Sequence, residues 1–234
     1  MTHKDLFASN GKTLLADLIE QNFPLINIVG RLGMDLRMGR YTVAEVCDKA
    51  GVDLETFMLI CKIYTYDDFV PTDNLLDKVS VKDIVKYLHA SHQYYAGTAL
   101  VQLEESIENL LRPCSEKQKS AIWKFYSEYS DEVRRHFSYE EEQLFPYLDM
   151  LCCGKENNGY SISQFEEHHS NVDEKLADLK NLIMRYLPEE CDNNLCMQTI
   201  SLIFHLETDL LHHTRIEDEI LVAVVNRIEK NGRK

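Results

Sequence analysis

The chain has 234 residues, of which 44% are hydrophobic and 27% charged, and its net charge is −14 at pH 7. This composition is typical of a folded globular protein and not of a disordered one. The excess of negative charge argues against nucleic acid and anionic membranes as partners, because both bind clustered lysine and arginine. It suits a protein that handles cations.

The location of the protein is predicted from its first residues and its cysteines. The first twenty residues carry five charged side chains without a continuous apolar stretch, so we expect no signal peptide, and no membrane span is apparent. The seven cysteines show no framework spacing, which is typical of reduced thiols. Adjacent Cys152 and Cys153 fit a helix end better than a redox or metal site. We therefore expect a cytoplasmic protein.

The N-terminal part of the sequence predicts small helices. Residues 6–66 contain short helical patterns that are broken by Pro24 and by glycines such as Gly30 and Gly51. Residues 69–74 lack helical periodicity and predict a linker. We expect a small helical domain over residues 1–75.

Four long amphipathic segments follow, over residues 79–111, 115–151, 161–186 and 194–229. Their apolar residues recur with the 3.6-residue period of a helix. Long helices with short connections predict an all-α fold in which the helices form an up-down-up-down four-helix bundle. We assign this bundle to residues 76–234.

Two isolated histidines and two His-x-x-x-Glu pairs recur in these segments with one offset of 77 residues. They are His92 and His169, His136 with Glu140, and His213 with Glu217. Residues four apart on a helix share one face and can bind the same ion. A lone histidine is more often a core residue, and one such pair is often an exposed contact. The common register favours metal ligands instead.

The six ligands point to a dinuclear centre. Four imidazoles and two carboxylates exceed the needs of one tetrahedral zinc ion and suit two transition-metal ions. A carboxylate on each paired helix can bridge the ions, which leaves positions for dioxygen, nitric oxide or water. Nitrogen and oxygen ligands without thiolate favour iron, manganese or zinc over copper(I).

Neighbouring residues leave two ligand choices open. His168 competes with His169, and His89 competes with His92; only the 77-residue register favours His169 and His92. Tyr95 follows His92 by three residues, so its hydroxyl is a candidate partner for an imidazole or a bound oxygen species, and a plain core tyrosine is an equal alternative.

Two acids precede the paired histidines by four residues each. Glu132 and Asp209 again differ by 77 positions. One interpretation is a pair of solvated or hydrogen-bonded helix residues. The other is a polar entry path for iron beside the ligands.

The order of these motifs resembles the hemerythrin-like domain and, in detail, the RIC family (repair of iron centres). The segment from His136 to Pro146 is similar to the signature of that family, and the segment from His213 to Glu217 is similar to its second copy. Residues 29–55 resemble the small N-terminal domain of the family. Leu36–Gly39 stands where the family usually has a pair of cysteines, so thiol chemistry of that domain is not expected here.

The resemblance implies a non-haem protein with two iron ions in an Fe–O–Fe centre, with manganese or zinc as alternatives. It implies repair or protection of iron-sulfur clusters under nitrosative or oxidative stress, by iron donation or by chemistry of nitric oxide or dioxygen. Damaged iron-sulfur proteins are then expected partners. Two other classes stay open: a di-iron gas or redox sensor or oxygen-binding module, and, least favoured, a helix-turn-helix regulator over residues 41–57, whose second half is acidic.

Overall fold

The computed structural model describes residues 7, 11–155, 159–168 and 174–232. Helices make up 78% of the structure, and the described residues contain no β-strand. The all-α fold class that the sequence predicts is thus confirmed. No helix among these residues combines the length and the apolar character that crossing a membrane requires.

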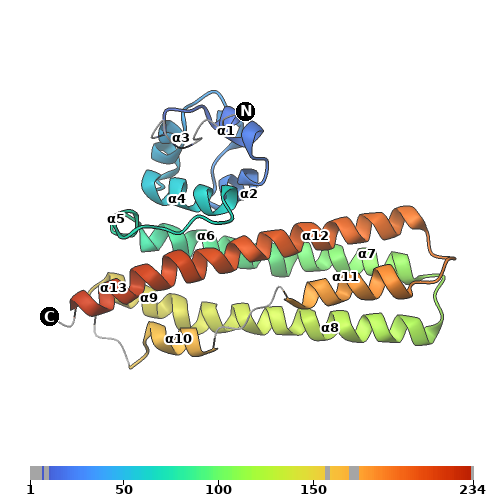
Figure 1. The fold of residues 1–234 in the computed structure, drawn as a ribbon. Helices are drawn as coiled ribbons and strands as arrows, with labels where there is room; N and C mark the ends of the chain where they lie inside the picture. The colour runs from blue at the N-terminus through green and yellow to red at the C-terminus, as the bar shows by residue number, and fades with distance from the viewer. Residues whose placement is uncertain (1–6, 8–10, 156–158, 169–173, 233–234) are drawn as a thin grey trace. The chain divides into compact units, whose positions relative to one another are not determined.

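The N-terminal third consists of short helices (Figure 1). They are α1 (Leu15–Gln21), α2 (Leu25–Arg31), the 3-10 turn η1 (Leu36–Met38), α3 (Val43–Ala50), α4 (Leu54–Thr65) and α5 (Asp73–Leu76). Side chains fix where two of them begin: Thr42 and Glu45 cap α3 reciprocally, and Asp53 accepts the backbone N–H of Thr56 at the start of α4. Gly51 ends α3 with a φ of 63°, which a glycine adopts without strain.

The rest of the chain forms long helical stretches. They comprise α6 (Val81–Tyr94), η2 (Tyr95–Ala99), α7 (Leu100–Leu111), α8 (Glu116–Tyr139), η3 (Glu140–Leu144), α9 (Phe145–Cys152), α10 (Ile162–His168), α11 (Glu174–Tyr186), α12 (Asn193–Ile216), η4 (Glu217–Val222) and α13 (Ala223–Gly232). The three η elements in this part are π-helical turns that continue their helices without a break. The stretches 81–111, 116–152 and 193–232 begin and end close to the predicted segments, and α10 and α11 lie within the predicted segment 161–186, on either side of residues that the structure does not describe.

The chain divides into two compact units that are interleaved along the sequence. The first comprises Met1–Ser91, Tyr147–Ile162 and Arg215–Lys234, and the second comprises His92–Pro146 and Ser163–Thr214. The sequence instead predicts two consecutive domains that meet at residue 75. That boundary stays a prediction.

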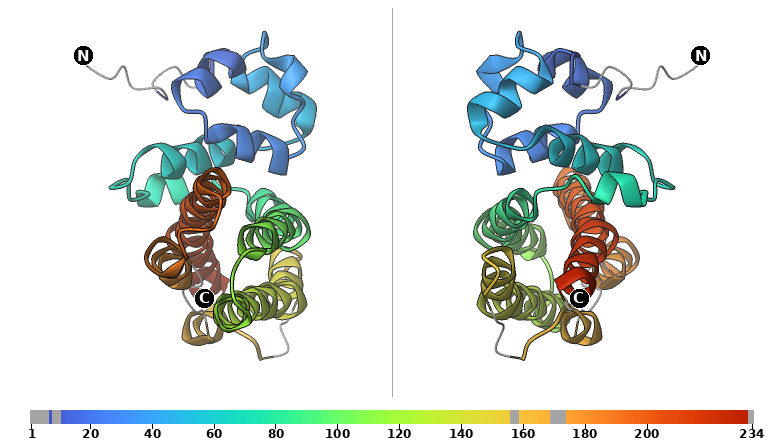
Figure 2. Two further views of the ribbon diagram at one scale, coloured as in Figure 1. Left: turned by 90° about the vertical axis from the view of Figure 1, so that its right-hand side faces the viewer. Right: turned by 90° about the vertical axis from the view of Figure 1, so that its left-hand side faces the viewer.

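The second unit is a four-helix bundle in its own right. Its long helices α7, α8, α11 and α12 lie side by side, and successive helices run in opposite directions (Figures 1 and 2). Buried side chains from all four helices form one core, which includes Tyr95, Leu103, Ile107, Tyr126, Tyr129, Leu179, Ile183, Ile203 and Leu210. Ser115 and Asp192 mark the starts of α8 and α12, because the side chain of Asp192 and the Ser115–Gln118 pair hold the first backbone groups of these helices.

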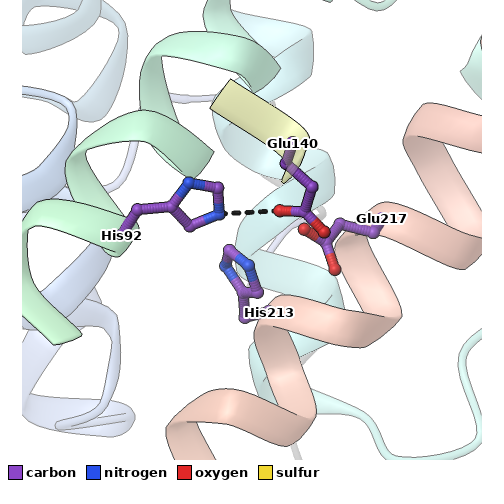
Figure 3. Close-up of side chains that lie close together, drawn as sticks. All are labelled: His92, Glu140, His213 and Glu217. Atoms are coloured by element: carbon purple, nitrogen blue, oxygen red, sulfur yellow. Dashed lines mark ion pairs between the residues drawn. The ribbon is translucent and has the colours of Figure 1, made fainter. Parts of the chain in front are cut away.

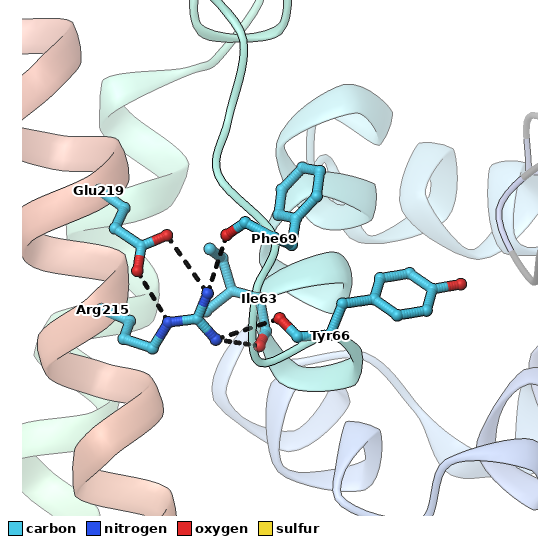
Figure 4. A network of polar contacts seen from close by, with 5 residues as sticks. All are labelled: Ile63, Tyr66, Phe69, Arg215 and Glu219. Carbon is cyan, nitrogen blue, oxygen red and sulfur yellow. Dashed lines mark hydrogen bonds and ion pairs between the residues drawn. The ribbon is translucent and has the colours of Figure 1, made fainter.

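The first unit joins the small helices to the C-terminal helical stretch. Arg215 is the anchor: its guanidinium donates to the backbone carbonyls of Ile63 (3.0 Å), Tyr66 (3.3 Å) and Phe69 (2.9 Å), where α4 ends (Figure 4). Glu219 pairs with the same guanidinium at 2.8 Å. The carbonyls at a helix C-terminus lack partners within the helix, so a cation is well placed there.

Candidate metal centre

The predicted ligands stand where the long helices change from α- to π-helical turns. Glu140 is the first residue of η3, Glu217 is the first residue of η4, and η2 begins three residues after His92. A π-helical turn inserts one extra residue and re-aims the side chains around it, and such turns are frequent at functional sites. The two glutamates thus share a local backbone geometry as well as a sequence register.

Four of the predicted ligands come together in one cluster. His92, Glu140, His213 and Glu217 each offer a ligand atom, and these atoms all lie within 4.8 Å of one another (Figure 3). All four side chains are buried, and both glutamates are 0% exposed. The imidazole rings of His92 and His213 meet edge to face, with centroids 5.1 Å apart.

His136, the fifth predicted ligand, adjoins this cluster. Its Nε2 atom lies 2.9 Å from Oε1 of Glu140, whereas Nε2 of His92 lies 2.9 Å from Oε2 of the same carboxylate. Glu140 therefore spans two imidazoles from different helices, one on each oxygen. This is the arrangement in which a carboxylate can bridge two metal ions.

His169, the sixth predicted ligand, lies outside the described residues, as does the side chain of its competitor His168. The other open choice concerns α6: His92 is 4% exposed within the cluster, whereas the side chain of His89 is exposed. His212, next to His213, is also buried, at 6% exposure. The full ligand set remains a prediction from the sequence.

The cluster suits metal cations by the chemistry of its donors. Two carboxylates that are fully buried and close together repel each other unless positive charge lies between them. Imidazole nitrogen and carboxylate oxygen are the ligands that iron, manganese and zinc accept. The residues present therefore fit a cation centre, and each ion would be held by groups that are already buried.

A carboxylate outside the predicted set holds one ligand in place. Oε1 of Glu141 lies 2.7 Å from Nδ1 of His92, on the side of the ring opposite the cluster. The ring also stacks on Phe137, with centroids 4.3 Å apart, and on Phe145, at 5.4 Å. A carboxylate on the far nitrogen of a ligand histidine fixes its tautomer and orientation.

Helix periodicity in the sequence does not single out Glu141. Adjacent residues point to different helix faces, so the position after Glu140 is not expected near the ligands. The run of three glutamates from Glu140 to Glu142 was the one available signal.

Tyr95 and the two upstream acids occupy different surroundings. The Tyr95 hydroxyl donates to the backbone carbonyl of Asp209 (3.1 Å), and its ring meets that of His213 edge-on. Asp209 is 6% exposed, whereas Glu132 is partly exposed and forms an ion pair with Lys175. The proposed roles of these three residues stay predictions.

Comparison with known protein families agrees with this geometry. A family model described as "Hemerythrin HHE cation binding domain" matches residues 83–225, a range that contains all six predicted ligands. No curated protein matches the chain.

Proposed function

Because the chain belongs to the hemerythrin HHE cation-binding family, we propose that its histidine and glutamate cluster holds two iron ions and that the protein repairs or protects iron-sulfur clusters under nitrosative or oxidative stress. The finer part of this proposal, the likeness to the RIC family, rests on the motifs from His136 to Pro146 and from His213 to Glu217. The proposed place of action is the cytoplasm.

One observation carries the dinuclear part of the proposal. Glu140 meets His92 with one oxygen and His136 with the other, both at 2.9 Å. A site for a single ion would need only one of the two carboxylate oxygens. Glu217 adds a second buried carboxylate to the cluster, which supports the proposal of two bridging carboxylates.

The protein side of the chemistry follows from the surroundings of the ligands. When bound, a pair of iron ions supplies redox chemistry and open positions for dioxygen or nitric oxide. Glu141 holds the imidazole of His92 so that Nε2 faces the cluster. Phe137 and Phe145 cover the same ring and keep water from it. The chain thus provides buried, oriented ligands for a centre that would take small diatomic molecules.

Iron donation is the second branch of the proposed repair role. Histidine nitrogens and carboxylates bind ferrous iron less firmly than thiolates bind iron in a sulfide cluster, so transfer to a damaged cluster is chemically reasonable. A damaged iron-sulfur protein is the partner that this branch requires. If the site held manganese or zinc, the protein would have no iron to donate.

A sensor is the second candidate function, and Arg215 is the observation that favours it. Arg215 lies between the ligands His213 and Glu217 on one continuous helical stretch, and its guanidinium holds three carbonyls where α4 ends (Figure 4). A change at the ligands would therefore reach the small helices through a short covalent path. A gas or redox sensor needs such a connection between its ligands and a second part of the chain.

The deciding experiment starts with the full chain purified without oxygen. We expect about two iron ions per chain by elemental analysis, because six ligands suit two ions. The loaded protein is then added to an iron-sulfur dehydratase whose cluster nitric oxide has damaged, and the recovery of dehydratase activity is measured.

The control is the chain with Glu140→Ala and Glu217→Ala, which should bind little iron and restore no activity. One zinc ion per chain would contradict the di-iron proposal. Two iron ions without any recovery of the dehydratase, but with a nitric oxide-dependent change in the protease sensitivity of α4, would favour the sensor.

A further inference from the structure

Two cysteine thiols meet in the second unit, away from the candidate metal centre. Sγ of Cys114 and Sγ of Cys191 are 3.2 Å apart. Cys114 precedes α8 and Cys191 precedes α12, and both connections lie at the same end of the bundle (Figure 1). Cys114 is 5% exposed, and Cys191 is half-buried.

The contact follows from the duplication of the bundle. Cys114 and Cys191 are 77 residues apart, which is the offset of the histidine repeat. Each stands directly before the residue that begins the next helix, Ser115 or Asp192. In a unit that packs against its own copy, equivalent positions near the symmetry axis come together. The two thiols thus occupy equivalent positions in the two halves of the bundle.

We propose that Cys114 and Cys191 form a reversible disulfide by exchange with a low-molecular-weight disulfide such as oxidised glutathione. The Cys191 thiolate attacks one sulfur of glutathione disulfide, which forms a mixed disulfide and releases one glutathione. The Cys114 thiolate then attacks Sγ of Cys191, which forms the Sγ–Sγ bond and releases the second glutathione. The protein loses two electrons and two protons, and one glutathione disulfide becomes two glutathione molecules.

The geometry sets this order of events. Cys191 is the more exposed thiol and meets the reagent first, whereas buried Cys114 is shielded and acts second. Bond formation shortens the Sγ–Sγ distance from 3.2 Å to about 2.05 Å. Both residues lie in connections between helices, which adjust by such an amount more easily than a helix interior.

The surroundings of Cys191 make the exchange slow. Burial and the neighbouring Cys114 thiol raise the pKa of Cys191 to about 12, with further contributions from Cys196 and Glu190. The thiolate fraction is therefore very small at neutral pH and rises as the pH approaches that value, and the rate rises with it.

This disulfide is independent of the proposed function. Cys114 is separated from His136 by roughly 30 Å of helix, so the metal centre can be correct without the disulfide, and the disulfide without the metal centre. It is also compatible with the seven thiols being reduced under ordinary reducing conditions.

The test uses the full chain in glutathione buffers of increasing oxidised fraction, held for hours at a pH of about 8. Samples are quenched with acid, alkylated and digested, and linked peptides are identified by mass spectrometry. We expect a peptide that joins Cys114 to Cys191, lighter by two hydrogens than its parts, which disappears when reduced glutathione is added in excess. The exposed Cys152 and Cys153 serve as internal controls for access to the reagent.

Three outcomes would overturn the proposal. In the first, Cys114 and Cys191 stay alkylatable while Cys152 and Cys153 have reacted. In the second, Cys191 is found linked to Cys196, and in the third it carries glutathione only. Matched variants sharpen the test, since Cys196→Ser should retain the linked peptide and Cys191→Ser should lose it.

Thermal melting gives an independent readout. The oxidised wild type should melt at a higher temperature than the reduced wild type, because the crosslink restricts the unfolded chain. The double variant Cys114→Ser and Cys191→Ser should melt at one temperature in all glutathione buffers. An equal shift in wild type and double variant would assign the effect to other thiols.

Discussion

Nδ1 of His92 lies 2.7 Å from Oε1 of Glu141, so the residue that follows one predicted ligand orients another ligand on a different helix. The two helices are α6, which carries His92, and the stretch from α8 into η3, which carries Glu140 and Glu141. One helical turn thus supplies Glu140, which belongs to the cluster, and Glu141, which orients the ligand His92.

Glu141→Gln should weaken metal binding without abolishing it. The amide still meets the ring but no longer provides an anionic acceptor, and such partners of ligand histidines are typically worth 10- to 100-fold in metal affinity, on the order of 1–3 kcal/mol. Competition with a chelator of known affinity measures the effect. Glu142→Gln is the matched control, because Glu142 is exposed and adjacent; equal affinities of the two variants would remove Glu141 from the site.

Metal removal should lower the melting temperature of the bundle. The cluster buries two carboxylates at 0% exposure, and without a cation between them their like charges repel each other in the buried core. We expect chelation to shift the unfolding curve by several degrees and the shift to reverse on adding ferrous iron. Identical curves for the chelated and loaded protein would count against a buried metal site.

Glu140→Ala should release metal and loosen the bundle, and Glu217→Ala should act in the same direction. Each change removes a fully buried carboxylate that offers a ligand atom to the cluster, and Glu140 also meets two imidazoles. Iron content and urea unfolding of both variants measure this. Full iron content in the Glu140 variant would exclude it as a ligand.

Arg215→Met should free the segment that follows α4. The variant loses three bonds to backbone carbonyls and the pair with Glu219, which we expect to cost roughly 1–3 kcal/mol. Hydrogen exchange of residues 63–69 should speed up. Arg227→Met is the control, because Arg227 pairs with the exposed side chains of Asp73 and Asp77, and exposed pairs contribute little.

Helix periodicity and the 77-residue register predict the fold class and much of the site. The apolar period places the four long stretches, and the repeated spacing places His92, Glu140, His213 and Glu217 on facing surfaces. This works because a helix converts spacing directly into a face.

Helix spacing does not predict which residues of different helices come into contact. Adjacent residues differ by roughly 100° around an α-helix, so Glu141 is not expected to serve the site, and only the packing of α6 beside η3 brings His92 to it. The π-helical turns at Glu140 and Glu217 are likewise set by the tertiary structure. Cys114 and Cys191 also share the 77-residue register. The sequence alone does not predict that they meet, because their contact depends on how the two halves of the bundle pack.

Glu132 and Asp209 provide the last prediction, which concerns the entry of iron. Each lies one helical turn before a paired histidine, and Lys175 now accounts for one of them through its ion pair with Glu132. Glu132 is partly exposed and Asp209 is buried, and acids at these two depths suit a path along which a cation moves inward. Neither residue belongs to the ligand cluster, so the final metal content should not depend on them.

The double variant Glu132→Gln and Asp209→Asn should therefore load ferrous iron more slowly and reach the same iron content as the wild type. Loss of two negative charges lowers the local concentration of the cation, and we expect the rate to fall about tenfold at low ionic strength and the difference to shrink in salt. Stopped-flow mixing of the apo-protein with ferrous iron measures the rate. Glu128→Gln is the matched control, because Glu128 lies one turn earlier on α8 and its side chain is 65% exposed. If the double variant loads as fast as this control at low salt, the acids are structural, and iron reaches the ligands by another route.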